Sequence, residues 1–336
     1  MRFAPTAEQR DLTAVAQDLM ETLSPPTVVR AGPDAPEVDA LHRALVDLGA
    51  PGLLVSEPAG GLGLDENHLV PLLVEAGRAA VPLPLVETVA FAAAVLESAG
   101  LADDVLSGKA MCAADPAARG DVRFASRASL LLAGGFGGAG PIRVLDFAGA
   151  SREPVAAVDP AADLHRIAGA TERAVVADPA VVETAWLRGV LGAAAALVGL
   201  SRRMLEMTVE HVAARQQFGV PIGSFQAVKH HLASALLEVE FAAPAVAAAG
   251  AAMATGDPAR EREVSTAKAL ASDAALRAAR TAIQCHGAIA YTTEYDLHLF
   301  AKRAWALAAD WGSAAWHRAR VAQHLGLAGT GTPPAS

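Results

Sequence analysis

Cysteine, histidine and glutamate side chains, all of which can take part in catalysis, stand close together in the last fifth of the sequence. Cys285 precedes His286, a pair that could suggest a thiolate nucleophile activated by an imidazole. Adjacent residues on a helix do not face each other, so a buried small side chain is the better interpretation of Cys285. Glu294 follows, and on residue type alone it is an acidic residue in the first turn of a helix whose N-cap is Thr292 or Thr293.

Two other groups of residues have types that bind ligands. Residues 135–140 contain the pattern G-x-G-x-x-G, but a strand pattern follows it where a dinucleotide site needs a helix N-terminus, so we interpret it as a β-turn. The histidines at positions 211, 230, 231, 298, 317 and 324 lie on helical segments without cysteine or carboxylate at ligand spacing. The sequence therefore predicts no metal site, and histidines at the surface or in an interface.

Two longer stretches carry more information. Residues 215–226 read RQQFGVPIGSFQ, which predicts the end of one helix with the cation Arg215 at its C-terminus, a turn, and the start of a second helix. Residues 284–295 read QCHGAIAYTTEY, which predicts a long helix that is broken at Gly287, a short loop and a new helix.

Three patterns of residue types follow one another along the chain. Apolar residues recur at helical spacing up to about residue 100, and short β-branched runs separated by Gly, Pro and Asp fill residues 107–178. Long helical periodicity then returns up to about residue 327. We expect a mostly α protein with a small β insertion: an N-terminal helical domain over residues 1–103, a reduced middle β domain over 104–178, a C-terminal helical-bundle domain over 179–328 and a flexible tail over 329–336.

Composition limits the classes of protein to which the chain can belong. The sequence has 336 residues, 53% hydrophobic and 4% aromatic, and roughly a quarter are alanine, which favours helices and a sizeable core. The formal net charge is −9 without basic blocks, which argues against nucleic-acid binding. Two distant cysteines, a charged N-terminus and apolar stretches too short for a bilayer lead us to expect a cytoplasmic protein away from the membrane.

The two stretches resemble the C-terminal signatures of the FAD-dependent acyl-CoA dehydrogenase family, which read approximately R-x-Q-F-G-x-P-I-x-x-F-Q and Q-x-H-G-G-x-G-Y-T-x-E. Residues 45–64 and 72–88 also look like the family's helical entry segment, and the helix, β, helix order is the family's order. The resemblance implies an enzyme that removes the α-proton of an acyl-CoA and transfers hydride from the β-carbon to flavin, giving a 2-enoyl-CoA.

The resemblance also implies roles for individual residues. In this family the flavin ring lies between the β domain and the C-terminal helices of one protomer, and the neighbouring protomer holds the adenine end. Arg215 would approach the diphosphate of the neighbour's FAD, and Glu294 would be the catalytic base. The other residues of the FAD contact would be Phe218, Gln226, Gln284, Gly287 and Ala288.

The sequence departs from the family in the middle. The family stretch T-E-P-x-x-G-S-D, which lines flavin and substrate, is missing, whereas the contacts offered to a neighbour's FAD are retained. This fits a subgroup of short chains that assemble with a full-length paralogue into α2β2 heterotetramers, several of which act on steroid or other bulky acyl-CoA side chains. The resemblance therefore implies an acyl-CoA substrate, FAD shared with a paralogous subunit, and electron-transfer flavoprotein as the acceptor.

Three alternatives remain open at this point. The chain could be a non-catalytic scaffold subunit whose partner does the chemistry. It could be a flavin oxidase or hydroxylase of the same fold. It could also form a homo-oligomer, because alanine-rich helical faces allow close helix packing between copies.

Overall fold

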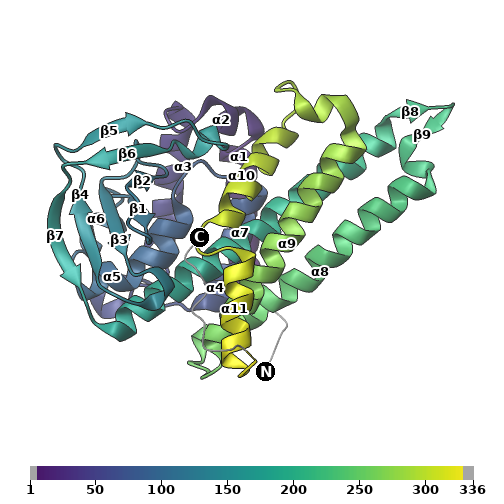
Figure 1. Ribbon diagram of the computed structural model, residues 1–336. Coiled ribbons are helices and arrows are strands. Elements are labelled where there is room, and N and C mark those ends of the chain that lie inside the picture. The colour runs from purple at the N-terminus through teal and green to yellow at the C-terminus, as the bar shows by residue number, and fades with distance from the viewer. Residues whose placement is uncertain (1–5, 328–336) are drawn as a thin grey trace.

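The computed structural model describes residues 6–327 and divides them into helices, a β region and a second set of helices (Figure 1). The tail predicted over residues 329–336 lies outside the described residues. The mostly α fold with a small β insertion is confirmed, while the domain limits stay a prediction.

Short amphipathic helices build the N-terminal part. Its first helix begins at a capping box in which the Thr6 hydroxyl accepts from the Gln9 backbone and the Gln9 side chain accepts from the Thr6 backbone. A π-helical turn, Val86–Phe91, precedes α5. The α-helices are α1 (Ala7–Leu23), α2 (Pro26–Ala31), α3 (Pro36–Asp47), α4 (Glu66–Arg78), α5 (Ala92–Ser98) and α6 (Ala102–Leu106).

The β region consists of two small sheets that pack around a core cluster of their own. In the first sheet, with order β1-β3-β4-β7, β1 and β3 are parallel and the other neighbours antiparallel; the second has order β2-β6-β5. The glycine-rich residues 135–140 join β3 to β4 as a turn, which confirms that interpretation. The strands are β1 (Cys112–Asp115), β2 (Asp121–Val122), β3 (Leu130–Gly134), β4 (Ile142–Asp146), β5 (Ser151–Pro154), β6 (His165–Ala168) and β7 (Thr171–Val176).

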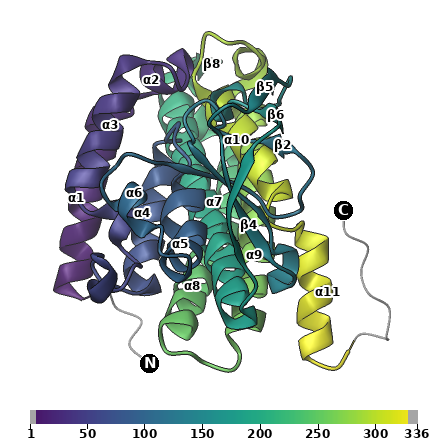
Figure 2. The ribbon, with the colours of Figure 1, turned by 90° about the vertical axis from the view of Figure 1, so that its left-hand side faces the viewer.

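Five helices form the C-terminal part, and the longest of them is the central helix of the molecule (Figures 1 and 2). They are α7 (Pro179–Ala214), α8 (Gln226–Ala254), α9 (Arg260–His286), α10 (Leu297–Ala309) and α11 (Ala314–His324). By length and composition α7 and α8 would pass as membrane spans, but the most apolar window of α7 is 78% buried in the fold. The corresponding window of α8 is only 28% buried, because α8 lies at the outer edge of the bundle.

Glycines allow α4 and α7 to cross at backbone contact. A Cβ atom on Gly199 would lie 1.9 Å from the carbonyl oxygen of Val74, and one on Gly77 would lie 2.1 Å from the carbonyl oxygen of Ala196. The crossing fixes the N-terminal helices against the central helix, and only glycine fits at either position.

The structure corrects two predictions of local detail. The helix expected to follow an N-cap at Thr292 or Thr293 has Asp296 as its N-cap and begins at Leu297, because a 3₁₀ turn over Gly287–Tyr291 and a bend come first. His317, expected at the surface or in an interface, is buried within the chain, with Nε2 2.8 Å from the carbonyl oxygen of Trp311.

Candidate functional site

The first motif-bearing stretch is an exposed hairpin at the far end of the helical bundle. Arg215 ends α7, and its backbone N–H donates to the carbonyl oxygen of His211 at 2.9 Å. The two-residue strands β8 (Gln216–Gln217) and β9 (Val220–Pro221) then form a tight hairpin. At its tip Phe218 has a positive φ of 55° and is 94% exposed, which is unusual for an aromatic side chain.

The second stretch is an exposed turn between α9 and α10. Gly287 has a φ of 67°, and a Cβ atom there would meet open space. Arg30 of α2 holds the turn, because its guanidinium donates to the carbonyl oxygen of Thr293 and to the carboxylate of Asp296. Glu294 lies on this turn, exposed.

All seven residues predicted to bind FAD or to act on substrate are therefore at the surface. Figure 1 places the β8–β9 hairpin and the α9–α10 turn at the same end of the C-terminal helices. Ring contacts link α7, α9 and the turn: His211 of α7 stacks on His286 of α9 with centroids 4.2 Å apart, and His286 lies 4.8 Å from Tyr295 of the turn. The exposed residues are Arg215, Phe218, Gln226, Gln284, Gly287, Ala288 and Glu294.

Sequence reasoning missed a buried ionic network where the three parts of the chain meet. Asp159 of the β region is 3% exposed and accepts from Arg123 and from Arg303 of α10. Arg123 also pairs with Asp310, which follows α10, and Arg303 donates to the carbonyl oxygen of Val81 in the N-terminal part at 2.9 Å. Because these residues lie far apart in the sequence, no spacing pattern could have revealed the network.

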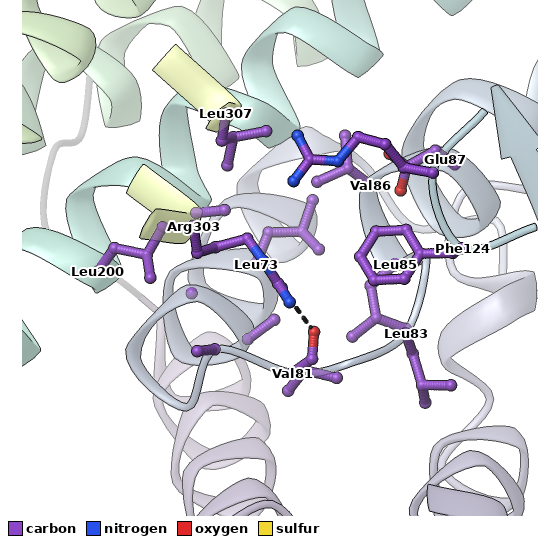
Figure 3. Close-up of a pocket in the computed structure, with 15 residues that line it drawn as sticks. Leu73, Val81, Leu83, Leu85, Val86, Glu87, Phe124, Leu200, Arg303 and Leu307 are labelled. Carbon is purple, nitrogen blue, oxygen red and sulfur yellow. Dashed lines mark hydrogen bonds between the residues drawn. The ribbon is translucent and has the colours of Figure 1, made fainter. Parts of the chain in front are cut away.

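A cavity of about 50 Å³ lies beside this network (Figure 3). Leucine, valine and alanine side chains from α4, α7, α10 and the segment of residues 80–86 form most of its wall, and Glu87, Arg123, Phe124 and Arg303 also line it. The Arg303 guanidinium lies 5.3 Å from the centre of the Phe124 ring. Small-molecule sites usually have volumes of about 300–1,000 Å³, so this cavity is far too small for a flavin ring.

Glu87 is the buried carboxyl of this cavity. It lies in the π-helical turn, and burial raises its pKa from 4.5 to about 7, although the charge of Arg123 acts in the opposite direction. The folded protein therefore holds this proton more tightly than the unfolded chain. Glu87 lowers the stability as pH rises from about 4.5 to about 7, because its carboxyl must ionise without water.

We predict that Glu87→Gln removes this penalty. The variant and the wild type should have equal stability at pH 4, and the variant should be more stable at pH 8 by about 2–3 kcal/mol. Urea denaturation at several pH values measures the difference, with Glu57→Gln, a change at an exposed carboxylate, as the control. Parallel stability curves for Glu87→Gln and the wild type would show that Glu87 does not titrate in this range.

Aromatic rings fill the contact between the β region and the C-terminal helices. Phe136 of the turn after β3 lies 4.8 Å from Trp186 of α7 and 5.3 Å from Trp316 of α11, measured between ring centroids. Trp311 joins them at 5.9 Å from Trp186, and its edge packs on Gly189. The rings and the ionic network together leave little free space along this contact.

A buried lysine fixes the loop that carries Asp310. Lys268 of α9 is fully buried, and its Nζ atom donates to the Ser272 hydroxyl at 3.0 Å and to the carbonyl oxygens of Ala308 and Gly312 at 3.3 and 3.2 Å. Burial lowers the pKa of this amine to about 7, and the charge of Asp310 acts in the opposite direction. The two carbonyl acceptors join α9 to the end of α10 and to the loop that follows it.

Comparison with known proteins gives a consistent result. Residues 180–326 match the model of the acyl-CoA dehydrogenase C-terminal domain. The acyl-CoA dehydrogenase IpdE2 of Mycobacterium tuberculosis is 33% identical over 313 residues, which cover 90% of this chain and 92% of that protein. The chain belongs to the acyl-CoA dehydrogenase family.

Solved structures of other acyl-CoA dehydrogenases share the fold. A chain of the ChsE4–ChsE5 complex from M. tuberculosis superposes with a TM-score of 0.84 at 22% identity, covering 98% of this chain and all of that one. A chain of the Tcur3481–Tcur3483 steroid ACAD gives a TM-score of 0.82 at 23% identity, covering 95% of this chain and 98% of that one. Membership of the acyl-CoA dehydrogenase family indicates FAD as the cofactor.

The residues of this acyl-CoA dehydrogenase family member fit FAD at the exposed end. The guanidinium of Arg215 and the amides of Gln226 and Gln284 are accessible donors for phosphate and adenine, and the open space at Gly287 allows a ligand to approach the backbone. The contact between the β region and the helices does not fit a flavin ring, because rings and ion pairs occupy it.

The half-buried Cys285 remains without a catalytic role in this chain. Burial raises the pKa of its thiol, which opposes formation of a thiolate. Within residues 6–327 no three His, Cys, Asp or Glu side chains are placed to hold a metal ion.

Proposed function

We propose that this chain is one subunit of a heteromeric, FAD-dependent acyl-CoA dehydrogenase and that it contacts FAD held by a paralogous partner subunit. One observation carries the proposal: all seven predicted site residues are exposed at one end of the bundle, while the chain's own interdomain contact is closed. A site with this division is complete only when a second subunit supplies the flavin pocket.

The outer face of α8 supports the proposal of a partner. Leu236, Leu237 and Phe241 are 49%, 58% and 65% exposed on a helix of high mean hydropathy. Contiguous exposed apolar surface on a helix is typical of a subunit interface. ChsE4–ChsE5 is a complex of two different chains, which favours a paralogous partner over a second copy of this chain.

The proposed reaction is α,β-dehydrogenation of an acyl-CoA to the 2-enoyl-CoA, with electron-transfer flavoprotein as the acceptor. Bound FAD supplies the hydride acceptor. Arg215, Gln226 and Gln284 bind the adenine half through charge-assisted and amide hydrogen bonds. Glu294 takes the α-proton once the partner covers the turn and excludes water from it.

The similar solved structures also suggest a substrate class. The name of the Tcur3481–Tcur3483 enzyme contains the word steroid, and we propose a bulky, steroid-derived acyl-CoA for this chain as well. The 50 Å³ cavity beside the ionic network is too small for such a group, and we propose that the acyl chain occupies a pocket of the partner or one formed between the subunits.

Flavin content tests the shared site directly. We predict that the chain purified alone carries no flavin, and that co-expression with a paralogous subunit gives about one FAD per two chains. Flavin absorbance per mole of protein measures both. One FAD per chain in the isolated protein would overturn the proposal, because the β region would then build a complete pocket.

A substitution at Glu294 distinguishes a catalytic subunit from a non-catalytic scaffold subunit. In the assembled complex, Glu294→Gln should lower kcat by about 10²–10⁴-fold while leaving flavin content unchanged. Glu153→Gln, the same change at an exposed position of β5, is the matched control. Undiminished activity in Glu294→Gln would support the scaffold alternative, which the exposure of Glu294 in the single chain favours.

The oxidase and hydroxylase alternatives differ in their electron acceptor. A dehydrogenase should turn over with electron-transfer flavoprotein and react slowly with oxygen. Rapid oxygen consumption by the complex would identify one of these alternatives instead.

A further inference from the structure

Three aromatic side chains from three different segments meet beneath the exposed loops. His211 lies in the last turn of α7, His286 is the last residue of α9, and Tyr295 belongs to the turn before α10. The imidazole rings of His211 and His286 are stacked, with a centroid distance of 4.2 Å and an interplanar angle of 23°. The Tyr295 ring lies 4.8 Å from His286 and 6.0 Å from His211. We call these three side chains the His–His–Tyr cluster.

The hydrogen bonds of His286 define its protonation state. Its Nδ1 lies 2.8 Å from the carbonyl oxygen of Ala282, an acceptor, so Nδ1 carries a proton and donates it. Its Nε2 is buried without a hydrogen-bond partner among the described residues. An Nε2–H would be a buried donor without an acceptor, so the ring is neutral in the folded chain.

Each member of the cluster adjoins a residue predicted to bind cofactor or substrate. The carbonyl oxygen of His211 accepts the hydrogen bond from the backbone of Arg215, Gly287 follows His286, and Glu294 precedes Tyr295. The cluster joins the end of α7, from which the β8–β9 hairpin extends, to the α9–α10 turn, and the hydrogen bonds of Arg30 hold the same turn from the side of α2.

We infer that His211 and His286 are positioning residues, which hold the two FAD-facing loops in register through stacking of neutral rings against Tyr295. The inference rests on the proposed function, because it assigns to the cluster the geometry of the shared FAD contact. Stacking of an aromatic pair favours the packed arrangement by about two- to twelvefold beyond the effect of the area that it buries, which is enough to select one loop arrangement.

The charges around the cluster make this arrangement sensitive to acid. From α7 the charged neighbours are Arg203, Glu210 and Arg215, and from the turn before α10 the neighbour is Asp296. Burial, followed by the charge of Arg215, lowers the pKa of His211. Burial also lowers that of His286.

Protonation in acid would place two like charges in stacked rings beside Arg215. The carboxylates Glu210 and Asp296 interact with the Tyr295 side of the cluster and offset part of this charge. The loops should therefore open when the pH falls below the ordinary pKa of a histidine side chain.

Hydrogen exchange of the full chain, without flavin or partner, tests the positioning role. At pH 7.5, His286→Ala should increase exchange about three- to tenfold in both residues 215–226 and residues 287–296, whereas His286→Phe, which keeps a flat ring, should leave both unchanged. His230→Ala, at an exposed histidine of α8, is the matched control. If His286→Ala opens only residues 287–296, or neither loop, the inference is wrong, because the ring then does not hold the hairpin.

A pH series provides the second test and does not depend on the alanine variant folding. After correction for the intrinsic pH dependence of exchange, the wild type should open both loops between pH 7 and pH 5.5, and the double variant His211→Phe/His286→Phe should not. Equal opening in both proteins would overturn the inference.

Flavin retention by the assembled complex over the same pH range links the cluster to FAD. The wild-type complex should lose flavin in acid, and the double phenylalanine variant should retain it. If no partner confers flavin, the proposed function fails while the exchange result still decides the positioning role. If flavin is shared but its loss is identical in the two complexes, the positioning inference alone fails.

Discussion

Asp159→Asn should lower the free energy of unfolding by about 3–5 kcal/mol, because it leaves Arg303 charged and buried without a counter-ion. The Asp159 carboxylate accepts from Arg123 at 3.2 Å and from Arg303, and Arg303 is only 8% exposed. Arg123 keeps Asp310 as a partner, whereas Arg303 has no second carboxylate among its hydrogen bonds. Urea denaturation at pH 7 measures the change.

Two further variants test whether the loss of stability comes from the buried ionic network. Asp121→Asn breaks an exposed ion pair with Arg166 and should cost less than about 1 kcal/mol. Adding Arg303→Met to Asp159→Asn should recover part of the loss, because it removes the unpaired charge. If Asp159→Asn costs no more than Asp121→Asn, the network does not hold the three parts of the chain together.

Gly199→Ala should destabilise the protein by about 3 kcal/mol or more. The added Cβ would lie 1.9 Å from the carbonyl oxygen of Val74 and 2.7 Å from the backbone nitrogen of Arg78, and backbone atoms cannot rotate away as a side chain can. The helices α4 and α7 would have to separate along a buried contact. The gain of about 1 kcal/mol in helix propensity from glycine to alanine is too small to offset this.

The same substitution at Gly250 is the matched control for the crossing. There a Cβ would meet Val70 Cγ2 at 3.1 Å and the carbonyl oxygen of Glu66 at 3.3 Å, distances that small shifts relieve. Gly250→Ala should change stability by less than about 1 kcal/mol. Thermal unfolding of both variants tests the pair, and a mild effect at Gly199 would mean that the α4–α7 contact is looser than described.

The elements that the sequence predicted well are those with a local cause. Apolar residues at helical spacing predicted the helices, and the glycine-rich turn at residues 135–140 was recognised because a strand pattern follows it. The start of α10 was misplaced because Thr292 and Thr293 are both acceptable N-caps. In the structure the helix begins at Leu297 instead. Arg30, more than 260 residues earlier in the sequence, binds the turn that precedes it.

In the candidate site, too, the sequence predicted the parts that are local and missed those that depend on distant residues. The two motifs located the exposed loops, because their residues are contiguous in sequence. The ionic network could not be located, because Arg123 and Asp310 are separated by 187 positions and an isolated charge in an apolar segment gives no partner. His317 was misjudged for a related reason: its burial depends on the loop of Trp311, which no local pattern shows.

The outer face of α8 leaves apolar side chains exposed on the isolated chain. In the proposed heteromer, a newly made chain exposes Leu237 and Phe241 to solvent until the partner binds, so chaperones, proteases and other unassembled chains can bind this apolar surface. A cell that made this subunit in excess would gain aggregates or fragments rather than a pool of spare protein. In the proposed heteromer, synthesis of the two subunits in matched amounts would shorten the time for which this apolar surface stays exposed.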